Sequence, residues 1–350
     1  MTSGIGERLK MARSLAGMSQ QDVADRVGLS RMAISKYEHE QMLPGSDVLI
    51  RLAQALAQPV EFFLRGPVRV SVRPAYRRRA ALRGKQVEAV LAQLQEWVER
   101  YLAVESLYPP GEFTPFTYPA GFPAPVADAA GIEAAADRLR AAWGLGDTPI
   151  DNLVELLEDQ GIKVGLVAGN DHFDACLFRL DDFHLYGAAP VMAVKAGIPG
   201  DRQRFNLAHE LGHLMLKVKE PLDVEKAASR FAGAFLVPAA AAYRELGQRR
   251  QSLGLYELHL LKHKYGMSMQ AWVYRARDLG IIEEATATRL FQQFRRDGIH
   301  RQEPGDPLPA EEPQRLTRLV LRALAEAVIS PARAAELLGL PWTEFLQRQA

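Results

Sequence analysis

Two histidines and a glutamate stand at a spacing that could hold a metal ion beside a general base. Residues 204–216, RFNLAHELGHLML, contain His209, Glu210 and His213 in the pattern HExxH. At 3.6 residues per turn, histidines four positions apart lie about 40° apart on one helix face, so both imidazoles can reach one ion. The glutamate projects about 100° from the first histidine, where it can contact a metal-bound water without being a ligand. This zinc-metallopeptidase pattern predicts peptide hydrolysis that depends on Zn²⁺, with Glu210 as the general base.

The helix that carries this pattern must also be held in place. Apolar side chains fall on the face opposite the histidines, where they can pack into a core, at Leu207, Leu211, Leu214 and Met215. Gly212 keeps the helix slim beside the metal, at a propensity cost of up to about 1 kcal/mol. A chance HExxH on a surface helix is the alternative, and the amphipathic pattern favours the metal site.

A catalytic zinc ion takes three protein ligands and leaves a fourth position to water, so a third ligand is needed. Residues 224–238, VEKAASRFAGAFLVP, read as a second amphipathic helix that ends at proline. Glu225 lies in its first turn, twelve residues after His213, which leaves room for the chain to reverse over the histidines. Asp223 is a rival ligand and Glu220 is a weaker one. The remaining alternative is that Glu225 only favours the helix N-terminus as a solvated carboxylate.

The segment QRFNLAHELGHLML, followed by ExxAxxFAxxFLVP, resembles the ImmA/IrrE family of metallopeptidases, and the resemblance covers about residues 130–285. It implies that His209, His213 and Glu225 hold zinc. It also implies that Glu210 takes a proton from the attacking water and returns it to the leaving amine. The resemblance further implies cleavage of a repressor or antitoxin-type protein, often one with a DNA-binding domain of the Xre type.

The match departs from the family pattern at two places. Ser229 stands where the family usually has asparagine, and Val237-Pro238 stands where it has methionine and proline. We expect the residues at these two places not to touch the proposed ligands. The departures would then bear only on the substrate cleft.

The N-terminal residues 1–64 predict four or five short helices. Ser19 and Ser30 are typical helix N-caps, and Gly28 is a typical helix end. The helix, glycine-containing turn and helix at residues 20–38 have helix-turn-helix spacing. The whole unit resembles the Xre/Cro-type DNA-binding domain.

In that fold the third helix, here residues 31–38, enters the major groove of double-stranded DNA with its N-terminal residues against base edges. Arg31 could read guanine, whereas Lys36 and Gln20 are better placed for phosphate. The predicted DNA contacts are Gln20, Arg31, Met32, Ser35 and Lys36. Each has a plainer interpretation as a solvated helix residue, and the domain itself could be a protein-interaction module. Two half-sites on an operator would require a homodimer.

Charge divides the chain in the same way. Residues 1–85 carry 15 Lys and Arg against 7 Asp and Glu, a net of +8, and the remainder carries 28 against 35, a net of −7. This asymmetry indicates a nucleic-acid-facing N-terminal part. Residues 65–85 contain no acid, so they form either a solvated linker or an additional phosphate contact.

We expect residues 65–130 to be a connector. Apolar residues from 87 to 101 form a short heptad-like seam that either dimerises the chain or packs on the next domain. The proline-rich residues 108–125 read as an extended linker or a strap over another surface.

The predicted metallopeptidase domain spans residues 131–285. Helices are expected at 132–143 and 150–160, and strands at 163–167, 175–180 and 191–194, which would form a small sheet beside the HExxH helix. An edge strand of such a sheet could hold an extended peptide by strand addition. Candidates for a second oxyanion donor are His259, His263, Tyr265 and Arg275.

Residues 286–350 read as a helical tail. A proline-rich stretch at 301–313 is expected to be a hinge, and ISPARAAELLGLPWTEFL is either a small helix-turn-helix-like module or a packing appendage. The fold class is therefore mainly α with a small β-sheet (α+β), with an all-α helix-turn-helix domain followed by a zincin-like domain.

Together these patterns predict a cytoplasmic, DNA-binding transcriptional regulator with a zinc-dependent endopeptidase domain. The single Cys176 allows no intrachain disulfide, and no apolar leader or long apolar run indicates a membrane. The expected partners are an operator, a second copy of the chain, and a protein substrate that is an Xre-type repressor, an antitoxin or the protein itself. The alternatives are a non-enzymatic transcription factor whose second domain senses a metal, ligand or protein, and an antitoxin.

Overall fold

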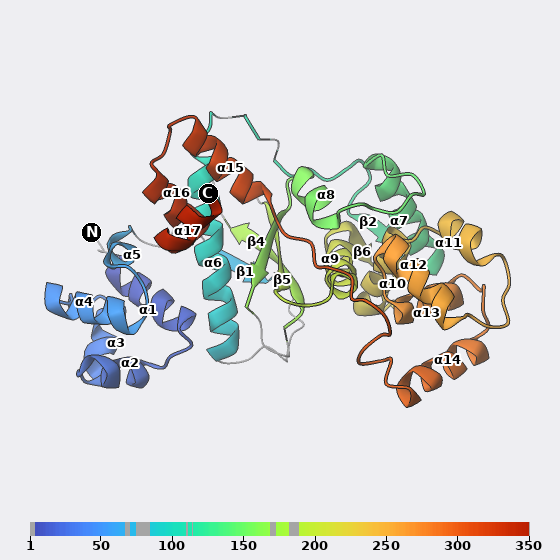
Figure 1. Cartoon of the computed structure of the whole chain (residues 1–350), viewed down its shortest axis with the longest axis horizontal. Helices are drawn as coiled ribbons and strands as arrows, with labels where there is room; N and C mark the ends of the chain where they lie inside the picture. Colours follow the sequence, from blue (N-terminus) through green and yellow to red (C-terminus); the bar gives the residue numbers. More distant parts are fainter. Residues whose placement is uncertain are drawn as a thin grey trace.

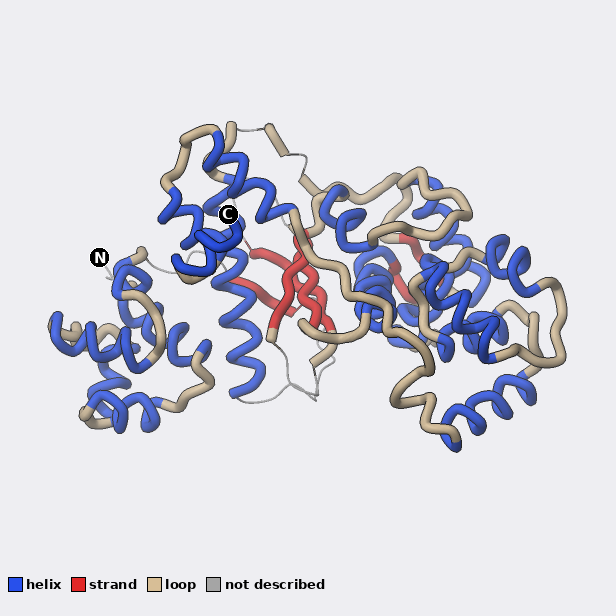
Figure 2. The backbone as a smooth tube through the Cα atoms, viewed as in Figure 1, coloured by secondary structure: helices blue, strands red, loops and turns tan. Residues whose placement is uncertain are grey.

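The structure, a computed structural model, describes residues 4–66, 71–74, 85–109, 111–113, 115–168, 173–181 and 189–349. Helices gather at the two ends of an elongated molecule, and a small sheet lies between them (Figures 1 and 2). The predicted α+β class is confirmed. Of the histidines in the sheet region, His172 and His184 lie outside the described residues.

The N-terminal end of the molecule is a compact set of short helices, as predicted. Ser19 begins the second helix with a capping box, in which its Oγ accepts the Asp22 N–H at 3.1 Å. Gly28 ends that helix in the left-handed region, at φ 67°, which a residue with a Cβ rarely adopts. The helices are α1 (Ile5–Leu15), α2 (Gln20–Val27), α3 (Arg31–Glu38), α4 (Ser46–Ala55) and α5 (Val60–Leu64).

The central sheet has the order β1-β4-β5-β3, with β4 antiparallel to both neighbours and β3 parallel to β5. Its strands are β1 (Ser71–Pro74), β3 (Lys163–Val167), β4 (Ala175–Asp181) and β5 (Pro190–Lys195). The last three match the predicted strands. β1 lies in the stretch that was expected to be linker. The sequence did not predict this strand, because its four residues are too few to show an alternating pattern. A short strand that ends in proline is typical of a sheet edge.

The long helix α6 (Lys85–Glu105) packs on this sheet. Val90, Leu94 and Val98 are buried against Phe178 and Val191 of the sheet strands. The heptad-like seam therefore covers a sheet within the chain. The C-terminal part of α6, at Tyr101 and Val104, packs in one cluster with α15 (Arg315–Ala325), α16 (Pro331–Leu338) and α17 (Trp342–Gln349).

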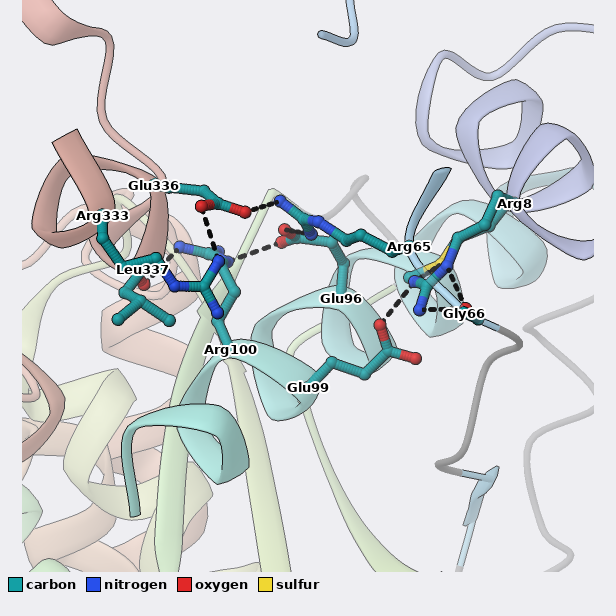
Figure 3. A network of polar contacts seen from close by, with 10 residues as sticks. Arg8, Arg65, Gly66, Glu96, Glu99, Arg100, Arg333, Glu336 and Leu337 are labelled. Atoms are coloured by element: carbon teal, nitrogen blue, oxygen red, sulfur yellow. Dashed lines mark hydrogen bonds and ion pairs between the residues drawn. The ribbon is translucent and has the colours of Figure 1, made fainter. Parts of the chain in front are cut away.

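An ion-pair network joins the N-terminal helices to α6 (Figure 3). Arg8 of α1 contacts Glu99 of α6 at 2.5 Å, and the same guanidinium donates to the Gly66 carbonyl at 3.0 and 3.2 Å. Both charged side chains are largely buried, with 6% and 13% of their surface exposed. The network thus fixes both α1 and the first residues after α5 against α6.

The same network reaches the C-terminal helices. Arg65 lies 2.7 Å from Glu336 of α16 and 3.8 Å from Glu96 of α6. Arg65 belongs to the basic stretch for which phosphate contact was one of two interpretations, and its charge is used here within the chain. The arginines at 69, 77, 78, 79 and 83 lie outside the described residues.

Two crossing helices, α9 (Gly200–Met215) and α10 (Val224–Leu236), form the centre of the other end of the molecule. Gly212 allows their close approach, since a Cβ there would lie 3.1 Å from the Ala228 Cα. Around them lie α7 (Ala129–Ala142), α8 (Leu153–Asp159), α11 (Ala239–Leu246), α12 (Leu255–Tyr265), α13 (Met269–Asp278) and α14 (Glu284–Arg296), and a two-stranded parallel sheet of β2 (Ala124–Val126) and β6 (Leu216–Val218).

The proline-rich stretch that was expected to be a hinge is docked against α8 and α9. Glu311 forms an ion pair with Arg204 of α9 and accepts the Val154 N–H at 2.9 Å. The Gly200 N–H donates to the Leu308 carbonyl at 2.8 Å. Among the described residues, none of the helices combines the length and apolarity that crossing a membrane requires.

Candidate metal centre

The structure brings His209, His213 and Glu225 into one cluster. The two Nε2 atoms of the histidines, one turn apart on α9, lie 3.1 Å from each other. The Glu225 carboxylate, from the first turn of α10, lies 3.3 Å from Nε2 of His209 and 3.7 Å from Nε2 of His213. One ligand atom from each of the three residues thus lies within 4.8 Å of the other two, between α9 and α10.

These separations suit a zinc ion. Bonds of about 2.0–2.2 Å around a tetrahedral centre place neighbouring ligand atoms about 3.4 Å apart. The Nε2–Nε2 separation of 3.1 Å lies below this length, and the separations from His209 to one carboxylate oxygen of Glu225, 3.3 Å, and from His213 to the other, 3.7 Å, lie on either side of it. Two imidazoles and one carboxylate are also a donor set that catalytic zinc uses, with a position left for water. The residues present thus fit the metal.

The two rival carboxylates occupy other positions. Asp223 is the N-cap of α10, where its Oδ1 accepts the N–H groups of Glu225 at 2.9 Å and Lys226 at 3.0 Å. Glu220 is exposed in the turn before α10. The cap holds the first turn of α10 in the orientation that directs Glu225 toward the histidines.

Glu210 is buried and connects α9 to the sheet. Its Oε2 accepts the backbone N–H of Leu177 on β4 at 2.8 Å. This hydrogen bond fixes one carboxylate oxygen of Glu210 beside β4. In the sequence, Glu210 directly follows the candidate ligand His209. This is a suitable arrangement for a general base, because the hydrogen bond sets the direction in which the carboxylate points.

Ser229 was expected not to touch the ligands, and this expectation is wrong. Its Oγ lies 3.2 Å from Nδ1 of His209, on the side of the ring away from Nε2. A metal-bound imidazole commonly donates its other N–H to such a partner, which fixes the tautomer and the ring orientation. The sequence contained a signal for the position of Ser229 near the ligands, since Ser229 follows Glu225 by one helical turn on the same face of α10.

A cavity of about 1310 Å³ opens beside the cluster and is lined by residues of α9, α10, α13 and the segment 299–307. Glu225, Ser229 and Arg275 are among the residues that line it. Of the four candidates for an oxyanion donor, Arg275 lines this cavity, but it is buried and ion-paired with Glu133 at 2.8 Å. Tyr265 donates to Glu245 instead, and the rings of His259 and His263 lie against each other.

The outer face of α3 is available for DNA. Arg31, Met32 and Lys36 are exposed, and the exposed fraction of Met32 is 69%. Ser35 is half-buried, with its Oγ 3.5 Å from His39 Nδ1. At the start of α2, the Gln20 amide donates to Glu38 at 2.8 Å, so its side chain already has a partner within the domain. These residues remain predicted DNA contacts.

Comparison with known proteins gives the class of each end of the chain. The family model described as a helix-turn-helix domain matches residues 6–67. The family model described as an IrrE N-terminal-like domain matches residues 172–277, which include His209, His213 and Glu225. The chain therefore combines a helix-turn-helix domain of the Xre type with a domain of the IrrE/ImmA type, whose fold is metallopeptidase-like.

The relatives match a short part of the chain, and their names describe HTH-type regulators. A prophage-derived HTH-type transcriptional regulator of Bacillus subtilis (strain 168) is 39% identical over 61 residues, which are 17% of this chain and 56% of the relative. An HTH-type transcriptional regulator of Sinorhizobium medicae (strain WSM419) is 34% identical over 59 residues, which are 17% of this chain and 42% of the relative. The chain thus spans about half the length of the curated relatives it matches.

Proposed function

We propose that the protein is a DNA-binding transcriptional regulator whose second domain is a zinc-dependent endopeptidase. The observation that carries this proposal is the cluster of His209, His213 and Glu225, whose ligand atoms lie within 4.8 Å of one another. Glu210 lies on α9, the helix that also carries the two histidines. A domain that only sensed a metal would have no need of Glu210.

The chain's own residues divide the work of peptide hydrolysis. Zinc held by His209, His213 and Glu225 would supply Lewis-acid chemistry, which lowers the pKa of water toward about 7 and polarises a carbonyl group. Glu210 receives a proton from the attacking water and delivers it to the leaving amine, while the Leu177 N–H holds its carboxylate in place. Ser229 holds the ring of His209.

The proposed substrate is a repressor or antitoxin-type protein with an Xre-type domain, or a copy of this protein. The fusion of both domains in one chain supports this proposal, since DNA binding would localise the peptidase at the operator where such a repressor is bound. The protein would act as a homodimer in the cytoplasm, where the operator DNA is found.

The test begins with the metal content of the purified protein. Candidate Xre-type proteins are then followed by mass in cells that express wild type or Glu210→Gln. A protein that disappears only with wild type establishes the peptidase and names its substrate. Stoichiometric zinc without cleavage in either strain favours the sensor, and absence of any bound metal refutes the ligand assignment.

A non-enzymatic regulator or antitoxin is the second candidate. It is favoured by the ion pair that joins α1 to α6 (Figure 3) and by the apolar contacts that join α6 to the sheet, because these contacts connect the side of the metal site with the DNA-binding domain. In that case Glu210→Gln would leave both operator regulation and the level of every candidate substrate unchanged.

A further inference from the structure

The outer edge of β4 is held by a segment from the connector between the two domains. β1 pairs with β4 in antiparallel register, from Ser71 opposite Asp181 to Pro74 opposite Phe178. β4 itself begins earlier, at Ala175. Within the described residues, no strand pairs with the outer side of β4 at positions 175–177. The strand β1 therefore covers one half of this edge and ends close to the other half.

The direction of the β4 backbone groups can be assigned from one hydrogen bond. The Lys195 N–H donates to the Asp174 carbonyl at 2.8 Å, so Asp174 directs its backbone groups toward β5. Because these directions alternate along an antiparallel strand, Leu177, Arg179 and Asp181 direct theirs outward. Arg179 and Asp181 then face Arg73 and Ser71 of β1, and the outward N–H of Leu177 is the one that donates to Glu210.

The direction of β1 leads toward the proposed general base. Since β1 is antiparallel to β4, its chain proceeds from Asp181 toward Leu177 and Glu210. Arg179 is two residues from Leu177, a distance of about 7 Å along an extended strand. Strand addition holds a peptide through main-chain hydrogen bonds on such an edge. An extended substrate lying on β4 would need the hydrogen-bonding groups that β1 uses.

We infer that the outer edge of β4 is the peptide-binding edge of this site and that β1 is the chain's own competitor for it. This inference rests on the proposed peptidase function and adds a means of regulating it. The partner that fits is an extended peptide with accessible backbone groups. A folded protein segment would not displace β1.

The tether of β1 strengthens this competition. Gly66, held by Arg8, and Ser71, the first residue of β1, are separated by four residues. A short tether keeps β1 at an effective concentration in the millimolar range beside β4. It also links the occupancy of the edge to the position of the DNA-binding domain, which the same Arg8 fixes on α6.

Proline substitutions can distinguish the backbone N–H groups of β1 that face β4 from those that point away from it. The N–H of Arg73 faces β4, so Arg73→Pro removes a ladder donor. The N–H of Val72 points away from β4, where proline is tolerated in an edge strand, so Val72→Pro is the matched control. Arg73→Gln controls for the lost charge. All variants are made in the full chain with Glu210→Gln, so that a bound peptide is not cleaved, and their folding is checked by circular dichroism.

The binding measurement uses a fluorescent peptide that copies residues 69–76. We expect Arg73→Pro to bind it at least about tenfold more tightly than the parent, because the site is no longer largely occupied. Val72→Pro and Arg73→Gln should bind it like the parent. Equal Kd values in all four proteins, or no binding by Arg73→Pro, would overturn the inference.

Amide hydrogen exchange gives a second, independent readout. The N–H groups of Arg179 and Asp181 should be protected in the parent and in both controls, and should lose this protection in Arg73→Pro. Equal protection in all proteins also contradicts the inference. A different result would contradict the proposed function alone. In that result, zinc-loaded Arg73→Pro with its native Glu210 binds the peptide but does not cleave it.

Discussion

The hydroxyl of Ser229 lies 3.2 Å from Nδ1 of His209, while Nε2 of the same ring faces Glu225. If Nε2 binds zinc, Nδ1 carries the proton and donates to Ser229. We predict that Ser229→Ala lowers zinc affinity about 10- to 100-fold, because the ring loses the partner that fixes its tautomer and orientation. Ser229→Asn should retain most of the affinity, since its side-chain oxygen can also accept. Competition with a chelator measures the zinc affinity, and equal values for all three proteins would contradict the prediction.

The third ligand can be distinguished from its neighbour by two amide substitutions. Glu225→Gln should lose stoichiometric zinc, since a neutral amide is a poor zinc ligand. Asp223→Asn should keep it, because asparagine also caps a helix and can accept the same two N–H groups. Metal content after gel filtration is the measurement. The reverse result would make Asp223 the ligand.

Glu210→Gln should separate catalysis from metal binding. The glutamine can still accept the Leu177 N–H, so the fold and zinc content should be unchanged. Cleavage should fall by about 10²- to 10⁴-fold, the usual contribution of a positioned general base. The rate is followed by mass spectrometry on the substrate identified in cells. Cleavage at the wild-type rate by a zinc-loaded variant would remove Glu210 from the mechanism.

Local patterns were sufficient to predict most elements of the fold. The HExxH helix, its partner helix and three strands were expected within a few residues of where they lie, because each has a periodic apolar face and defined ends. The strand β1 was missed, since its pairing with β4 depends on residues about a hundred positions away. The docking of Glu311 on Arg204 is likewise a long-range contact that a proline-rich sequence does not reveal.

The cluster of possible ligands could be predicted because the spacing within each helix brings its members to one face. Ser229 lies on the same face of α10 as Glu225, but its contact with the ring of His209 depends on how α10 crosses α9. The same holds for Arg65, since its basic neighbourhood suggested phosphate, whereas its partners Glu96 and Glu336 are distant in sequence. Partners of charged side chains are set by tertiary packing, which a single sequence does not specify.

Two residues of α3 are predicted to act differently on DNA. Once an operator has been selected from a random DNA pool, Arg31→Ala should weaken its binding by about 1–3 kcal/mol and relax specificity at one position. Lys36→Ala should weaken binding to all sequences and reduce the slope of log K against log salt by about 1. Arg348→Ala, which removes an exposed charge from α17, is the control and should change neither quantity. Fluorescence anisotropy over a range of salt concentrations distinguishes these outcomes.

Stability should depend on pH through Glu158, which is buried at the end of α8 and accepts the N–H groups of Gln314 and Arg315. Burial raises the pKa of this carboxyl from 4.5 to about 7. Its stabilising contribution is therefore complete below pH 4.5 and is lost as the pH rises through about 7. Glu158→Gln stays neutral, so the variant should gain up to about 3 kcal/mol in the free energy of unfolding, relative to wild type, between about pH 5 and 8. Urea unfolding across this range is the measurement, and a difference between the two proteins that does not change with pH would refute it.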